Sequence, residues 1–94
     1  MYHGKVVIRS LTTKHPPCRD EQCGYIVQNL YALLEKKPND YGSLKMVVVR
    51  HGLYKAVLRF SCEYVTDFIN FKDDFYRYYA DRFTWRGNKL WPVK

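Results

Sequence analysis

Hydrophobic positions recur with two alternating periods along this chain of 94 residues, and each change of period predicts a new element. Residues 5–13 form the first predicted strand, because their β-branched side chains favour an extended backbone. Apolar residues at intervals of three and four then predict a helix from Asp20, as its N-cap, to about Lys37. Its apolar stripe consists of Cys23, Ile26, Val27, Leu30, Leu33 and Leu34.

The second half of the chain repeats this succession of periods. Residues 39–43 have the composition of a loop. Two β-rich runs, 44–50 and 53–60, then flank His51 and Gly52, and this arrangement predicts a hairpin.

A second amphipathic helix is predicted to follow the hairpin, from Ser61 or Cys62 to about Phe83. Its expected apolar face consists of Val65, Phe68, Ile69, Phe75, Tyr76, Tyr79, Ala80 and Phe83. Lys72 falls within that face, so we expect the helix to be rotated until this lysine lies at the rim. Residues 85–91 predict a last short edge strand.

The order of these elements is strand, helix, strand, strand, helix and strand. Right-handed crossovers place both helices on the same face of one antiparallel sheet. The sequence therefore predicts an α+β fold, a two-layer sandwich of the ferredoxin-like type. A chain of 94 residues supports one hydrophobic core, so residues 1–94 are expected to form a single domain.

If helices cover only one face of the sheet, each strand offers one set of side chains to them and the other set to solvent. Burying lysine or arginine is costly, so the charged set of each strand is expected to face solvent. The predicted inward set is Val6, Ile8, Leu44, Met46, Val48, Tyr54, Ala56, Leu58 and Phe60. The predicted open set is Lys5, Val7, Arg9, Lys45, Val47, Val49, Leu53, Lys55, Val57 and Arg59.

The charge of the chain is unevenly distributed. Its 16 lysines and arginines against 9 carboxylates give a net charge of +7, which favours polyanionic partners. Residues 63–83 hold five of the carboxylates and only three cations, and Asp67, Asp74 and Asp81 recur every seven residues on the side expected to face solvent. A polyanion is therefore expected to approach the sheet and to avoid this helix.

The open face allows three interpretations. Its charges keep a small protein soluble, or its cations contact nucleic-acid phosphates while aromatic residues stack on bases, or its valines form the centre of a protein interface. The main hypothesis is nucleic-acid binding without catalysis. The alternative is a modulator or inhibitor, of the phage or viral accessory type, that docks an acidic surface of a larger nucleic-acid enzyme. The candidate binding residues are Lys5, Arg9, Lys45, Lys55, Arg59, Trp85, Arg86, Lys89 and Trp91.

Recognisable catalytic chemistry is sparse. RNA-recognition modules share the predicted topology, but their stacking aromatics lie on the open face of the third strand, where this chain has aliphatic and basic residues. His15, Cys18 and Cys23, with Cys62 or His3, lack the spacing of a known zinc motif, so we expect no metal and no cofactor. A metal-independent ribonuclease is a minor alternative, for which the chain offers Arg50, His51, Tyr54, Lys55 and Arg59.

The chain is expected to be cytoplasmic and to lie outside membranes. Its longest apolar runs are far shorter than the roughly 20 residues of a membrane span, and the apolar stretch near its start is too short for a signal peptide. Three cysteines, an odd number, are typical of a reducing compartment. The oligomeric state is left open between monomer and homodimer.

Overall fold

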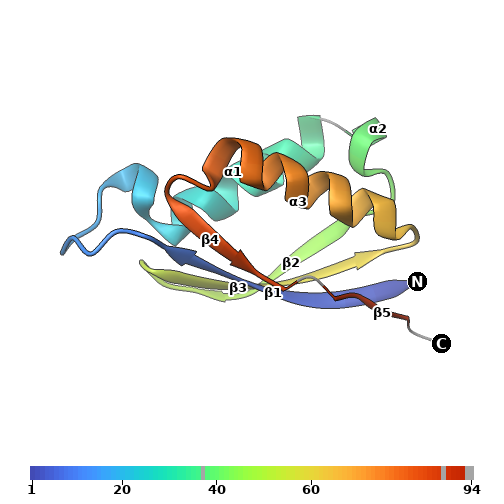
Figure 1. Cartoon of the computed structure of the whole chain (residues 1–94), viewed down its shortest axis with the longest axis horizontal. Coiled ribbons are helices and arrows are strands. Elements are labelled where there is room, and N and C mark those ends of the chain that lie inside the picture. Colours follow the sequence, from blue (N-terminus) through green and yellow to red (C-terminus); the bar gives the residue numbers. More distant parts are fainter. Residues whose placement is uncertain (37, 88, 93–94) are drawn as a thin grey trace.

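The computed structural model describes residues 1–36, 38–87 and 89–92, and its strands form one antiparallel sheet with the helices on one face (Figure 1). The strands are β1 (Tyr2–Ser10), β2 (Lys45–His51), β3 (Lys55–Cys62), β4 (Phe83–Arg86) and β5 (Trp91–Pro92). The helices are the 3-10 turn η1 (Arg19–Glu21), α1 (Cys23–Lys36), the short α2 (Pro38–Tyr41) and α3 (Val65–Tyr79).

The strand order is β2-β3-β1-β4, and β5 pairs with β1. Helix α1 connects β1 to β2 with β3 between them, and α3 connects β3 to β4 with β1 between them. Each crossover is therefore a split βαβ unit, and the chain has the predicted α+β, ferredoxin-like fold. In Figure 1 the two long helices both lie above the sheet. Strand β5 pairs with the start of β1, so the last described residues lie beside the N-terminal end of the sheet.

Strands β4 and β5 follow the same edge of β1 but are out of register with each other by one residue. Ile8 pairs with Trp85 in the first segment, whereas His3 pairs with Trp91 in the second. The extra residue forces the chain to bulge between them. Gly87 permits the bulge because its φ is +132° and an added Cβ would lie 2.3 Å from the Lys5 carbonyl oxygen.

The core lies between the sheet and the helices and is rich in aromatic rings. Phe71 and Trp85 each contact Phe60 of the central strand β3, with ring centroids 5.6 and 5.5 Å from it. The fully buried side chains include Val6, Ile8, Cys23, Ile26, Leu30, Leu58, Phe60, Phe71 and Phe75. The burial of these side chains confirms the inward set predicted for β1 and most of that predicted for β3.

Several predicted boundaries are wrong by a few residues. The first strand ends at Ser10 rather than residue 13, residues 39–43 contain part of α2, and Phe83 belongs to β4 rather than to the second helix. Asp20 is not an N-cap: it lies in η1, and its carboxylate pairs with Arg82 across 3.4 Å. The predicted helix end at Lys37, and Asn88 within the predicted last strand, lie outside the described residues.

Helix α3 presents a different face to the core from the one predicted. Phe68, Phe71 and Phe75 are its buried residues, whereas Ile69 and Tyr76 are 47% and 45% exposed. Rotation about the helix axis moves Lys72 to a half-buried position at the rim, as expected.

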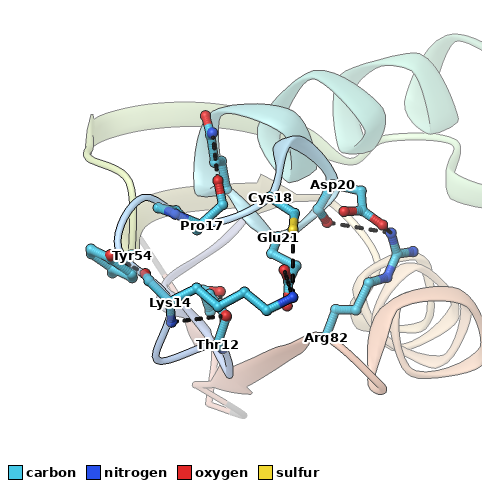
Figure 2. A network of polar contacts seen from close by, with 10 residues as sticks. Thr12, Lys14, Pro17, Cys18, Asp20, Glu21, Tyr54 and Arg82 are labelled. Carbon is cyan, nitrogen blue, oxygen red and sulfur yellow. Dashed lines mark hydrogen bonds and ion pairs between the residues drawn. The ribbon is translucent and has the colours of Figure 1, made fainter.

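The carboxylates of the helix layer hold loops in place. Asp67 accepts hydrogen bonds from the backbone N–H and the hydroxyl of Ser43 at 3.0 and 2.8 Å, and Asp74 accepts one from the buried Tyr41 hydroxyl. Figure 2 shows a similar set of polar contacts in the loop that follows β1. There Lys14 Nζ lies 3.6 Å from the Glu21 carboxylate. Asp67 and Asp74 are therefore half-buried structural groups, contrary to the prediction that they face solvent.

Candidate functional site

The sheet face opposite the helices carries cations from four strands, and we call it the basic face. The pairing register fixes which residues share it, because side chains directly opposite each other point to the same side. Lys5 lies opposite Arg59, and Arg9 lies opposite Lys55. The cations of the basic face are Lys5, Arg9, Lys45, Arg50, Lys55, Arg59 and Arg86, all of them exposed. The predicted placement of the five strand cations on one side is thus confirmed.

No aspartate or glutamate lies in a strand of the described ranges: all nine of these residues are described and occur in helices or connecting segments. Lys14, Arg77 and Arg82 form ion pairs with carboxylates of the described residues, and none of the three belongs to the basic face. The seven cations therefore lie together without a neutralising partner in the described part of the chain. Two of their pairings, Lys5 with Arg59 and Arg9 with Lys55, place like charges directly opposite, which costs stability.

Arg50 belongs to the basic face although strand alternation does not place it there. Val48 pairs with Leu58 and Arg50 pairs with Val57, so β2 has one extra residue, Val49, at this point. Such a bulge shifts the alternation by one and turns the following side chain to the other face. The only sequence signal is the run of three valines at 47–49, in which no polar residue marks the alternation.

The valines of this face do not form an exposed apolar centre. Val57 is only 3% exposed, although it lies on the side away from the helices. Its neighbours in the register are Val7 on one side and Arg50 on the other. Val47 remains 59% exposed, but it lies on the edge strand β2.

Trp85 was predicted to join the open face, and this prediction is wrong. It pairs with Ile8, whose side chain is inward, and it is 6% exposed. Its indole N–H donates to the Gly87 carbonyl oxygen at 2.9 Å, and its ring packs 5.0 Å from that of Phe75. The one-residue shift between β4 and β5 explains the error, because it puts Trp85 and Trp91 on opposite faces despite their even spacing.

Trp91 does lie on the open side and is 62% exposed. It borders a shallow hollow of about 340 Å³ that is also lined by His3, Gly4, Lys5 and Arg59. Gly4 allows this arrangement, because an added Cβ would lie 2.4 Å from Leu90 and 2.9 Å from the Lys89 carbonyl oxygen. Lys89 itself is exposed within the bulged segment that precedes Trp91.

A second hollow, of about 380 Å³, lies at the β2–β3 hairpin and is lined by Arg50, His51, Gly52, Leu53, Tyr54, Lys55 and Val57. It brings together four of the five residues considered for a ribonuclease. The Tyr54 hydroxyl, however, donates to the Lys14 carbonyl oxygen and lies 2.7 Å from His15 Nδ1. These contacts fix Tyr54, which was predicted to be inward within β3, in the turn instead.

The three cysteines differ in their surroundings: Cys18 is exposed, whereas Cys23 and Cys62 are buried. Cys23 is fully buried, and its thiol donates a long hydrogen bond, 3.8 Å, to the Ile8 carbonyl oxygen. Burial raises the pKa of this thiol to about 11, which keeps it protonated at neutral pH. Within the described ranges, His, Cys, Asp and Glu form no group of three or more that could hold a metal ion.

None of the helices in the described ranges combines the length and the apolar character that a membrane crossing requires. No protein-family model matches the chain, and no curated protein matches it either. Among solved structures, a dimeric ferredoxin-like protein from an uncultured marine organism aligns with 99% of this chain and 94% of its own, with 8% identity and a TM-score of 0.46. The strand order and pairing register described above carry the fold assignment.

Proposed function

We propose that this protein binds nucleic acid through contacts between the basic face and backbone phosphates, and that it binds rather than catalyses. The observation that carries the proposal is the set of seven exposed cations on an uncovered sheet face, with every carboxylate outside the strands. Cations gathered on one surface attract a polyanion, and each phosphate contact releases counterions. Contacts of this kind give affinity with little sequence preference.

The repulsion between paired cations on the basic face is a second argument for an anionic ligand. Like charges that face each other across β1 and β3 destabilise the free protein by a few tenths of a kcal/mol or more per pair. A phosphate placed between Lys5 and Arg59 would replace this repulsion with two attractive contacts. A surface shaped for solubility alone would intersperse charges of both signs.

The apolar-interface hypothesis has less support. Of the four valines on which it rests, Val57 is buried and Val7 is half-buried, which leaves Val47 and Val49 exposed along the edge strand. The basic face also opposes pairing of two copies through this surface, because their charges would repel. The proposal therefore requires only a monomer. It places the protein in the cytoplasm, where its three free cysteines would stay reduced.

Charge reversal tests the proposal directly. Lys55→Glu combined with Arg59→Glu removes two cations from the centre of the basic face, and we expect binding of a fluorescent oligonucleotide to weaken at least tenfold at moderate salt. The matched control is Lys36→Glu with Arg77→Glu, which changes the net charge equally but alters exposed positions of α1 and α3. Equal weakening in both variants would show that net charge, not the basic face, causes binding.

The ligand class is tested by capture from lysate with and without nuclease. Binding predicts that oligonucleotide co-purifies with the protein and that added nuclease removes it. In a separate incubation with the protein and chelator, the oligonucleotide should stay intact. A stoichiometric acidic protein that stays bound after nuclease treatment would replace this proposal with the modulator hypothesis. Cleaved RNA in the presence of chelator would replace it with the ribonuclease hypothesis.

A further inference from the structure

We infer that the nucleic acid is single-stranded and that the hollow beside Trp91 holds one unpaired base, stacked on the indole ring. This inference rests on the proposed function and specifies the ligand of the same face. It starts from the contrast between the two tryptophans of the chain: Trp85 is 6% exposed, and Trp91 is 62% exposed. Tryptophan side chains are on average largely buried in folded proteins. An exposed indole among cations is typical of a surface on which unpaired bases stack.

The register places the components of a nucleotide site in adjacent rows of the sheet. Trp91 lies opposite His3 in one row, and Lys5 lies opposite Arg59 in the next. The rows are two residues apart along β1, or about 6.7 Å at the usual rise of an antiparallel strand. One nucleotide spans such a distance between its base and its phosphate, so a base on Trp91 would place a phosphate at Lys5 and Arg59.

Duplex nucleic acid does not fit this face in the same way. Four strands spaced about 4.8 Å apart make a surface roughly 15 Å wide before side chains are counted, whereas the major groove of B-DNA is about 12 Å wide. The helices, which could enter a groove, lie on the other side of the sheet with most of the carboxylates (Figure 1). Stacking on Trp91 further requires a base that is free of its partner.

The face also offers a path for the strand beyond this hollow. From Lys5 and Arg59 the surface continues past the buried Val57 to Arg50 and Lys55 at the hairpin hollow. Arg59 and Lys55 are four residues apart on β3, or about 13 Å. We therefore expect a site of about four nucleotides, at the low end of the range for small single-strand-binding domains.

The test compares wild type, Trp91→Ala and Trp91→Phe for binding to a labelled oligothymidylate, an oligouridylate of equal length, a DNA duplex and inorganic polyphosphate. We expect wild type to prefer the single strands over the duplex. Trp91→Ala should weaken single-strand binding at least fivefold and leave polyphosphate binding unchanged, while Trp91→Phe keeps most of the affinity. Comparison of the DNA and RNA arms shows which sugar is preferred.

Tryptophan fluorescence gives a second readout of the same contact. Stacking of a base should quench the emission of Trp91, and the quenching should be lost in Trp91→Phe, whose remaining emission comes from the buried Trp85. The control variant is Tyr78→Ala, which removes an aromatic ring 46% exposed on α3 and should leave binding unchanged.

The outcomes separate this inference from the function on which it rests. Tight oligonucleotide binding that Trp91→Ala does not weaken, or a preference for the duplex, overturns the base site and leaves phosphate binding by the basic face intact. Loss of polyphosphate binding in Trp91→Ala shows that Trp91 supports the fold of this corner rather than a base, and also overturns it. Absence of binding by wild type to every probe overturns both proposals.

Discussion

The two sides of the sheet use their charges differently. On the helix side, carboxylates have intramolecular partners: Asp67 holds Ser43, Asp74 holds Tyr41, and Asp20 pairs with Arg82. On the basic face, seven cations have no carboxylate beside them in any strand, and two of their cross-strand pairs are repulsive. Groups that stabilise the fold thus lie in one layer, and groups that the fold does not need lie in the other. This difference is the basis for proposing the basic face as the binding surface.

The largest loss of stability is expected from a substitution in the core between the helices and the sheet. Phe71→Ala removes a fully buried ring that packs 5.1 Å from Tyr41 and 5.6 Å from Phe60. Because the cavity cannot collapse completely, the free energy of unfolding should fall by about 3–5 kcal/mol. Urea denaturation measures this loss. A fall below about 1 kcal/mol would mean that the aromatic cluster is not the core described here.

The bulge that separates the two tryptophans is the next most sensitive point. Gly87→Ala puts a Cβ on a backbone with φ of +132°, next to the Lys5 carbonyl oxygen, and should cost about 2 kcal/mol. Gly24→Ala is the control, because nothing lies within 4 Å of its added Cβ in α1. That change should stabilise the protein by about 0.5–1 kcal/mol. Equal thermal stability of the two variants would argue against the bulge.

Alkaline pH should weaken the helix side selectively. Burial raises the pKa of the Cys23 thiol from 9.0 to about 11, so the folded state keeps a proton that the unfolded chain has lost. The contribution of this protonated thiol to the free energy of unfolding is complete below about pH 9. Between pH 9 and 11 the free energy of unfolding should fall by about 2 kcal/mol.

Two matched variants, Cys23→Ala and Cys18→Ala, test this loss of stability at alkaline pH. Cys23 is buried and Cys18 is exposed, so only the first should flatten the fall of the urea midpoint with pH. Burial also raises the pKa values of Cys62 and Tyr79, and a smaller slope should therefore persist in Cys23→Ala. A slope that is identical in wild type and both variants would contradict the assignment.

The smallest change in the free energy of unfolding is expected from a substitution on the basic face. Unlike the losses predicted above, this change should be an increase. Arg59→Gln removes one half of a like-charge pair with Lys5, so the free energy of unfolding should rise by a few tenths of a kcal/mol. The same variant should bind oligonucleotide several-fold more weakly. Stabilisation together with weaker binding is the signature of a residue kept for its ligand, and a loss of stability would count against that role.

The order of the elements was sufficient to predict the fold, and strand alternation was sufficient to place five cations on one face. Burial of Lys5, Lys55 or Arg59 is so costly that the period of two alone decides which side faces the helices. Alternation failed where an extra residue shifts the register. Arg50 follows the bulge at Val49, and the shift between β4 and β5 sends Trp85 inward and Trp91 outward. The valine run at 47–49 is at most a weak signal of the first insertion, and the position of each insertion is fixed by pairing with β3 or β1.

The face that α3 presents was mispredicted for a different reason. Large apolar and aromatic residues flank its apolar stripe on both sides, so Ile69 and Tyr76 compete with Phe71 for the core. Phe71 is buried because its ring fits among Phe60, Tyr41 and Trp85. The exact rotation of such an amphipathic helix depends on the shape of the space beneath it, which the sequence of the helix does not contain.

The central claim is that the cations of the basic face contact phosphates, and the salt dependence of binding tests it most directly. For single strands, the logarithm of affinity falls with the logarithm of salt concentration by about 0.7 for each phosphate neutralised. Engagement of most of the seven cations therefore predicts a slope between about −3 and −5, reduced by about 0.7 in Arg59→Gln. A slope near zero, or one that Arg59→Gln leaves unchanged, would contradict the claim.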